Sequence, residues 1–130
     1  METVIRLCAV GLGGCIGAVF RYIISGWVQE RSGSIAFPYG TLTVNLMGCF
    51  IIGVLTFLVE TRSFFSVETR TFLLIGLLGS FTTFSTFGNE TLMLLRSGRM
   101  GMAAGYAGTH VFLGVLMVWL GRVMASGIWR

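Results

Sequence analysis

A short stretch of the sequence, SFTTFSTFGNE at residues 80–90, combines aromatic rings and hydroxyl groups at a density that could bind an ion. It holds three phenylalanines and five serines or threonines inside a segment that is otherwise strongly apolar. A phenyl ring has a negative face and a positive edge. Ring edges beside hydroxyl and amide donors therefore favour an anion, whereas ring faces favour a cation. Both signs of charge stay open, because ring orientation is not encoded in the spacing.

The spacing of these side chains predicts two stripes if residues 82–89 form a helix. Positions i, i+3, i+4 and i+7 share one helical face, and here they are all polar: Thr82, Ser85, Thr86 and Asn89. Rings recur at every third residue beside them, at Phe81, Phe84 and Phe87. An alternative is purely structural, because hydroxyl groups in helices also bond to carbonyl groups four residues earlier.

The residues just upstream predict a break in this helix. Gly76, Gly79 and Ser80 weaken helical structure. An unwound stretch frees backbone groups, which a membrane tolerates only where they are buried in protein or line an aqueous cavity. Moving an ion into a medium of low dielectric constant costs about 20 kcal/mol, whereas one aromatic contact contributes about 1 kcal/mol. Many donors must therefore act together along a path.

Four further polar side chains lie in or beside apolar segments, where such residues are costly and become functional candidates. Asn45 offers two amide donors and one acceptor, and its alternative role is an interhelical hydrogen bond. His110 has no second histidine or carboxylate at metal-ligand spacing, so we expect a hydrogen bond to a neighbour. We expect Arg21 to reach the interface or a wet vestibule, and Glu90 to lie in a wet mouth at a helix end.

The elements that must position these residues are membrane-spanning helices. The chain has 130 residues, of which 55% are hydrophobic and 11% charged, against about 25% charged in soluble domains. A spanning helix needs about 20 apolar residues. The uncharged runs predict four spans, near 4–27, 39–59, 71–95 and 100–124, in one membrane domain that covers residues 1–130. We expect the first span to be a retained helix rather than a signal peptide, since no clear cleavage site follows it.

The basic residues are nine arginines, and no lysine is present. They lie at loop ends, which is typical of membrane flanks and does not indicate nucleic-acid binding. Four spans place five of them on one side (Arg6, Arg62, Arg70, Arg122 and Arg130) and three on the other (Arg31, Arg96 and Arg99), with Arg21 as a fourth if it reaches that interface. Such a weak bias predicts insertion in both orientations and an antiparallel dimer. The alternative is one orientation with a shallow bias.

Glycine pairs at spacing four predict close contacts between helices. Gly13 and Gly17 form one such pair, and Gly101 and Gly105 form another. Small residues allow backbones to approach within a membrane, where no hydrophobic drive acts between helices. Four short spans hardly enclose a solute path alone, so we expect an assembly.

Three segments resemble the Fluc (CrcB) family of fluoride channels: GGCIGAVFRY at 13–22, YGTLTVNLMGCFIIG at 39–53 and GLLGSFTTFSTFGNE at 76–90. The third is the most specific, and the chain length and span pattern match throughout. The resemblance implies an all-α membrane protein of the bacterial inner membrane. It further implies a dual-topology antiparallel homodimer, whose partners are lipid, fluoride and its own second copy, and two parallel fluoride pathways.

The resemblance also implies roles for individual residues. Phe84 and Phe87 match phenylalanines whose edges face fluoride, Asn45 matches a donor to the ion, and Arg21 matches a vestibule arginine. Ser85 and Thr86 match hydroxyls of a polar track, and Glu90 matches a glutamate near the pathway. The backbone carbonyls of Gly79 and Thr82 match those that hold a central structural sodium ion. Some relatives carry a serine where this chain has Gly114, so the polar track is predicted to be shorter here or filled by water.

The mechanism implied by the resemblance is passive export of fluoride from the cytoplasm, which lowers fluoride toxicity. Hydrogen fluoride enters as a neutral acid and dissociates, and the anion then leaves through the channel. A rival interpretation is a small dual-topology exporter of drugs that couples to protons through a membrane carboxylate, for which Glu90 is the one candidate. A structural subunit without transport is another alternative. No nucleophile–base pair or metal cluster suggests an enzyme.

Overall fold

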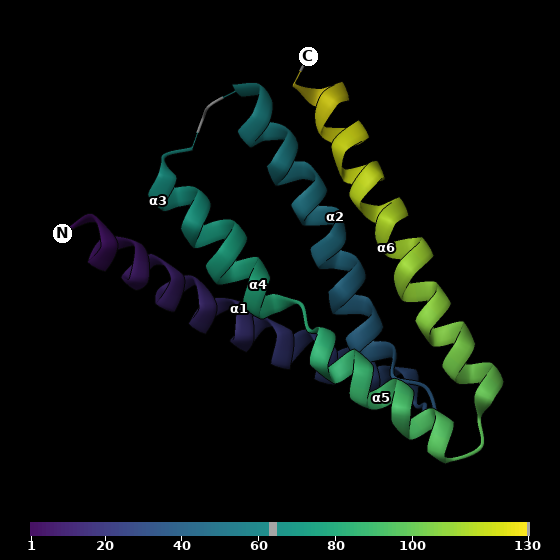
Figure 1. Ribbon diagram of the computed structural model, residues 1–130. Coiled ribbons are helices and arrows are strands. Elements are labelled where there is room, and N and C mark those ends of the chain that lie inside the picture. Colours follow the sequence, from purple (N-terminus) through teal and green to yellow (C-terminus); the bar gives the residue numbers. More distant parts are fainter. Residues whose placement is uncertain (63–64, 130) are drawn as a thin grey trace.

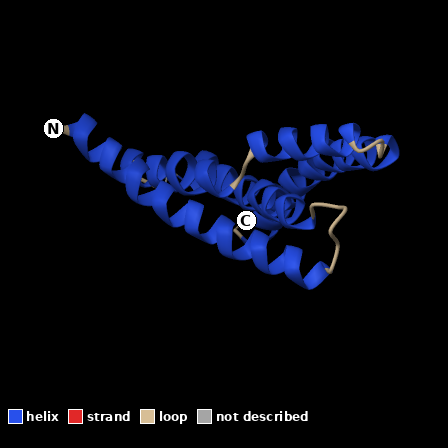
Figure 2. Cartoon of the chain, turned by 90° about the horizontal axis from the view of Figure 1, so that it is seen from below, coloured by secondary structure: helices blue, strands red, loops and turns tan. Residues whose placement is uncertain are grey.

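The computed structural model describes residues 1–62 and 65–129, and within these ranges it contains helices and loops but no strand (Figure 2). The first two helices are α1 (Glu2–Ser32) and α2 (Tyr39–Arg62), and the last is α6 (Met100–Ile128). The third segment consists of α3 (Val67–Arg70), η1 (Thr71–Leu78), α4 (Gly79–Phe81) and α5 (Phe84–Arg96). The four segments are long and apolar enough to cross a membrane, which confirms the predicted all-α membrane fold with four spans. Arg130, counted above in the charge balance, lies outside the described residues.

Local sequence signals set several helix ends. Gly33 ends α1 in the left-handed region with φ 61°, and Gly98 does so after α5 with φ 74°. A side chain at Cβ disfavours this conformation, which glycine adopts freely. Ser66 caps the N-terminus of α3 by accepting a hydrogen bond from the Thr69 amide. These signals keep the connections between the spans short.

The helices pack as two neighbouring pairs. Figure 1 shows α6 running alongside α2, while the first half of the third segment runs along α1. Few side chains are buried by this arrangement. One small core gathers around Val44, Leu78 and Phe81, and a second around Leu94, Ala103 and Tyr106. Most large apolar side chains point outward, as is expected for helices in contact with lipid.

Glycines make the closest helix contacts. A methyl group added to Gly13 or Gly17 of α1 would overlap backbone atoms of η1, such as the carbonyl oxygen of Leu77. The close contact predicted for this pair is therefore confirmed. Gly101 and Gly105 of α6 meet nothing within 4 Å of an added methyl group. The contact predicted for them is wrong within this chain, because this face of the helix points away from the other three segments.

The third segment is broken, as predicted, but the break lies further along the chain than expected. Gly79 keeps helical angles (φ −60°, ψ −31°), whereas Thr82 is extended (φ −90°, ψ 159°) and α5 starts only at Phe84. The predicted place of Thr82 in the polar stripe is therefore wrong, whereas Ser85, Thr86 and Asn89 do lie on one helix, α5. The Thr82 hydroxyl instead donates to the carbonyl of Leu78, 3.0 Å away, as the structural alternative for the hydroxyls predicted. The eight residues of η1 form a π-helix, which their sequence did not lead us to expect.

Candidate functional site

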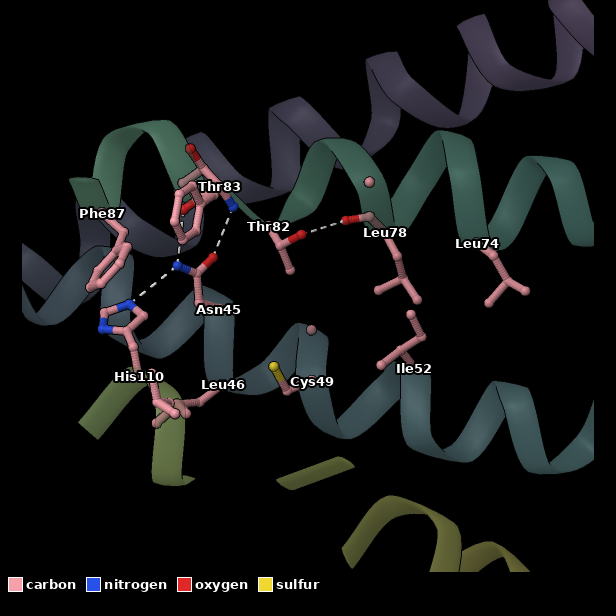
Figure 3. Close-up of a pocket in the computed structure, with 14 residues that line it drawn as sticks. Asn45, Leu46, Cys49, Ile52, Leu74, Leu78, Thr82, Thr83, Phe87 and His110 are labelled. Atoms are coloured by element: carbon pink, nitrogen blue, oxygen red, sulfur yellow. Dashed lines mark hydrogen bonds between the residues drawn. The ribbon is translucent and has the colours of Figure 1, made fainter. Parts of the chain in front are cut away.

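Asn45 on α2 holds the break in the third segment. Its side-chain oxygen accepts a hydrogen bond from the Thr83 amide at 2.8 Å, and its side-chain nitrogen donates to the Thr83 carbonyl at 3.0 Å. Unwound backbone groups in an apolar setting need such partners. Asn45 pairs with both the amide and the carbonyl of Thr83. Its alternative role, an interhelical hydrogen bond, is therefore confirmed. The side chain lies between Thr83 and His110 (Figure 3).

His110 on α6 contacts the other side of the same amide. Its Nε2 atom lies 3.2 Å from Nδ2 of Asn45, and its Nδ1 atom lies 3.0 Å from the carbonyl oxygen of Tyr106. The hydrogen bond to a neighbour that we expected for His110 is confirmed. The bond between Asn45 and His110 extends the contacts of the break from Thr83 through α2 to α6.

The two predicted pathway rings lie beside a cavity of about 380 Å³ that Asn45 and His110 also line. The Phe87 ring packs 4.3 Å from the His110 ring and 5.5 Å from that of Tyr106, centroid to centroid. The Phe84 ring lies 5.4 Å from the Phe87 ring, yet the residue is 82% exposed. The rest of the lining is mostly apolar and comes from α2 and the first half of the third segment (Figure 3).

A second cavity, of about 660 Å³, opens near the loop that joins α1 to α2, and it is lined by Glu90 and Thr41. One oxygen of the Glu90 carboxylate accepts a hydrogen bond from the Thr41 hydroxyl at 2.9 Å, and the other accepts from the Tyr106 hydroxyl at 2.7 Å. The carboxylate is thus held by neutral donors on α2 and α6. This arrangement keeps it half-buried at the wall of the cavity.

Hydroxyl groups connect the two cavities. Thr83 lines the first cavity and Thr86 lines the second. The Thr83 hydroxyl lies 2.9 Å from that of Thr86 and also accepts from the Thr86 amide, which caps the N-terminus of α5. Ser85 is exposed, and its hydroxyl lies 3.4 Å from that of Thr83. Polar groups therefore run without interruption from Asn45 to Thr86.

Gly79 and Thr82 both line the first cavity. In an unbroken helix, the Thr83 amide would donate to the Gly79 carbonyl, but here it donates to Asn45. The break therefore leaves the Gly79 carbonyl without this helical donor. Carbonyl oxygens are the ligands that hard cations prefer, so the donor chemistry fits a sodium ion. Among the described residues, no group of three or more His, Cys, Asp or Glu side chains is placed to hold a metal.

Two predicted pathway residues, Arg21 and Ser85, line neither of these two cavities. Arg21 is half-buried on α1, and Ser85 is exposed on α5. Sequence reasoning also missed three members of the site: Thr41, Thr83 and Tyr106. Their polar side chains within apolar segments were the available signal. Their partners, however, are set by the packing of α2, α5 and α6 against one another.

Comparisons with known proteins agree on one family. Residues 8–122 match the model of the family described as "CrcB-like protein, Camphor Resistance (CrcB)". A curated "Fluoride-specific ion channel FluC" of Methylobacillus flagellatus is 46% identical over 116 residues, which is 89% of this chain and 91% of the relative. Relatives of the same name from Acidobacterium capsulatum and Thermus thermophilus are 43% and 46% identical. They cover 92% and 95% of this chain, and 94% and 95% of their own lengths.

Proposed function

Because this chain belongs to the CrcB-like family, we propose that it is a fluoride-specific channel that lets fluoride leave the cytoplasm passively. It is a multi-pass protein of the plasma membrane, with four spanning segments. The relatives compared above are named as ion channels, which supports transport and not catalysis as the role of this chain. The resemblance noted in the sequence is thereby confirmed at the level of the family. The names of these relatives support the proposed function.

The observation that carries the proposal is the polar path through an apolar bundle. Asn45, Thr83 and Thr86 connect two cavities, and the rings of Phe84 and Phe87 stand beside this path. An anion needs partial positive charge to replace the water it sheds, and hydroxyl hydrogens, amide hydrogens and ring edges supply it. Several such groups within a few residues meet the requirement that no single contact can meet. Glu90 lines the second cavity, where its charge is held by hydroxyl groups.

The driving force needs no further component. One charge crossing a potential of 100 mV changes its free energy by about 2.3 kcal/mol, so a negative interior expels an anion that has a path. A proton-coupled drug exporter is not favoured. The comparisons name fluoride channels, and both oxygens of the one candidate carboxylate, Glu90, accept hydrogen bonds within the chain.

We further propose that the working unit is an antiparallel homodimer with two pathways. The Phe84 ring is 82% exposed although it stands beside the polar path, and a second copy would cover it. The weak arginine bias supports insertion in both orientations. In such a dimer, Arg21 would reach a vestibule formed with the partner. Cross-linking of protein inserted in both orientations tests this arrangement.

We propose a sodium ion as a structural component of that dimer, held by the carbonyls of Gly79 and Thr82. Support comes from the Gly79 carbonyl that the break leaves without its helical donor. The ion would supply a fixed positive charge where the third segments of the two copies meet. Replacing sodium by a larger organic cation during purification tests the proposal, with dimer stability as the measurement.

The first test of the function is fluoride efflux from liposomes, measured with a fluoride electrode and with chloride as the comparison ion. We expect Phe84→Ile or Phe87→Ile to lower the efflux rate at least about fivefold, because losing one ring contact costs about 1 kcal/mol and 1.4 kcal/mol is a tenfold change in rate. Phe112→Ile is the matched control, since that ring is 77% exposed on α6 and lines neither cavity. Unchanged flux in both site variants, with the protein folded, would refute the role of the rings.

A further inference from the structure

The hydrogen bonds around His110 fix the proton of its imidazole ring. Nδ1 lies 3.0 Å from the carbonyl oxygen of Tyr106. A carbonyl oxygen only accepts hydrogen bonds, so Nδ1 must carry a hydrogen. This first contact alone allows either the neutral ring with its proton on Nδ1 or the doubly protonated ring.

The second contact decides between these two forms. The orientation of the Asn45 amide is set by Thr83, whose amide donates to Oδ1 and whose carbonyl accepts from Nδ2. The atom that faces His110 is therefore the amide nitrogen, 3.2 Å from Nε2. An amide nitrogen only donates, so Nε2 must be the acceptor and carries no hydrogen. The two contacts together therefore indicate a neutral His110 with its proton on Nδ1. Figure 3 shows the contact between the Asn45 amide and the ring.

This arrangement uses both hydrogens of the Asn45 amide. One is donated to the Thr83 carbonyl and the other to Nε2 of His110. In this state the amide has no hydrogen left for an anion in the cavity. The predicted role of Asn45 as a donor to the ion therefore requires that one of these bonds opens.

We propose that His110 is a proton-dependent positioning residue, which holds Asn45 away from the anion when neutral and releases it when protonated. This inference rests on the proposed fluoride pathway. A proton taken from water onto Nε2 places two donors face to face, so the bond between the ring and the amide is lost. The cavity then receives an Nε2–H of a cationic ring and a free Asn45 N–H, which are two donors suited to a small anion.

The groups near the ring that can change charge come from three helices. Among the described residues they are Glu90 on α5, Tyr106 on its own helix α6, and Cys49 on α2, which lines the same cavity. An imidazole changes charge between about pH 5 and 8. Proton binding and fluoride binding then help each other equally, as linkage requires.

The test uses the fact that His110 is the only histidine in the chain. In protein labelled with ¹⁵N-histidine and reconstituted in lipid bilayers, each imidazole nitrogen gives a distinct signal. We expect a protonated Nδ1 and an unprotonated Nε2 near neutral pH without fluoride. We expect added fluoride, but not chloride, to raise the fraction of doubly protonated ring at about pH 6.5. A proton on Nε2 near neutral pH, or no response to fluoride, would overturn the inference.

A second test measures how the rate of fluoride efflux depends on pH. We expect fluoride efflux to rise several-fold, up to roughly tenfold, between about pH 7.5 and 5.5 as the protonated fraction grows. His110→Gln keeps an acceptor for Asn45 but does not titrate. Its fluoride efflux rates at pH 5.5 and pH 7.5 should therefore be equal. Protein-free liposomes correct for leakage of hydrogen fluoride. Equal pH dependence in both proteins would overturn this inference and leave the channel function standing, whereas no flux at all would defeat the proposed function itself.

Discussion

The two halves of the third segment are stabilised in opposite ways. The half before the break, residues 71–81, lies against α1, and its backbone is so close to Gly13 and Gly17 that no side chain fits between them. The half after the break, α5, is bound to α2 and α6 through hydrogen bonds of Asn45, Glu90 and their neighbours. The first half is therefore held by close packing of its backbone against α1. The second half instead presents polar groups whose hydrogen-bond partners can change.

The contrast has a functional meaning. A contact built from backbone and small residues has one arrangement, because an added atom has nowhere to go. Hydroxyl and amide groups can instead rotate and rebond to a passing ion at little cost. The rigid half thus fixes the position of the break, and the polar half supplies the donors. Predictions that disturb one half and not the other test this division.

The largest effect is expected from Gly17→Leu on the rigid half. The added side chain would overlap the Leu77 backbone, so α1 and η1 must separate, and we expect the free energy of unfolding to fall by more than about 3 kcal/mol, beyond the usual cost of overpacking. Unfolding in detergent or bilayers, followed by gel filtration, measures it. Gly11→Leu is the matched control, because nothing lies within 4 Å of a methyl group added on the same helix. Equal loss in both variants would remove the distinction between the halves.

A smaller effect on stability is expected from Asn45→Ala on the polar half. The change leaves the amide and carbonyl of Thr83 without their partner, which costs about 1–3 kcal/mol. We also expect fluoride efflux to be lost, because the path is interrupted. Asn89→Ala is the control, since that exposed amide contacts only the Met93 sulfur among the bonds described. A protein that keeps full flux without Asn45 would contradict the role of the polar half.

The smallest effect is expected from Glu60→Gln, which lies outside both halves. Glu60 and Arg122 form an exposed ion pair of 2.6 Å between α2 and α6. Exposed pairs contribute little, and salt screens them. We expect an unfolding midpoint within experimental error of the parent protein and unchanged fluoride efflux. A large loss of stability in this variant would show that charge pairs, and not the two halves of the third segment, hold the bundle together.

Much of the fold was predictable from the sequence, because hydropathy determines which segments can cross a membrane. Four spans, a broken third helix and the tight Gly13–Gly17 contact all follow from local composition. The position of the break was not predictable. Glycine propensity pointed to 76–80, but Asn45 provides partners at Thr83, three residues beyond that stretch. Tertiary contacts overrode the local preference.

The residues of the candidate site were likewise predictable only in part. Phe84, Phe87, Asn45 and Glu90 stood out because rings and polar groups in apolar segments are conspicuous. The contact between Asn45 and His110 could not be foreseen, since the two are 65 positions apart and only the packing of α2 against α6 brings them together. The direction of the ring edges toward an ion stays a prediction.

The bonds between Asn45 and Thr83 also impose an order on biogenesis. The backbone of Thr83 finds its partners on α2 and not within its own segment, so the third segment cannot adopt its final shape alone in lipid. The ribosome makes α2 first, and the residue that the later segment requires is therefore already in the bilayer when Thr83 arrives. The third segment therefore reaches its final shape only when it docks against α2.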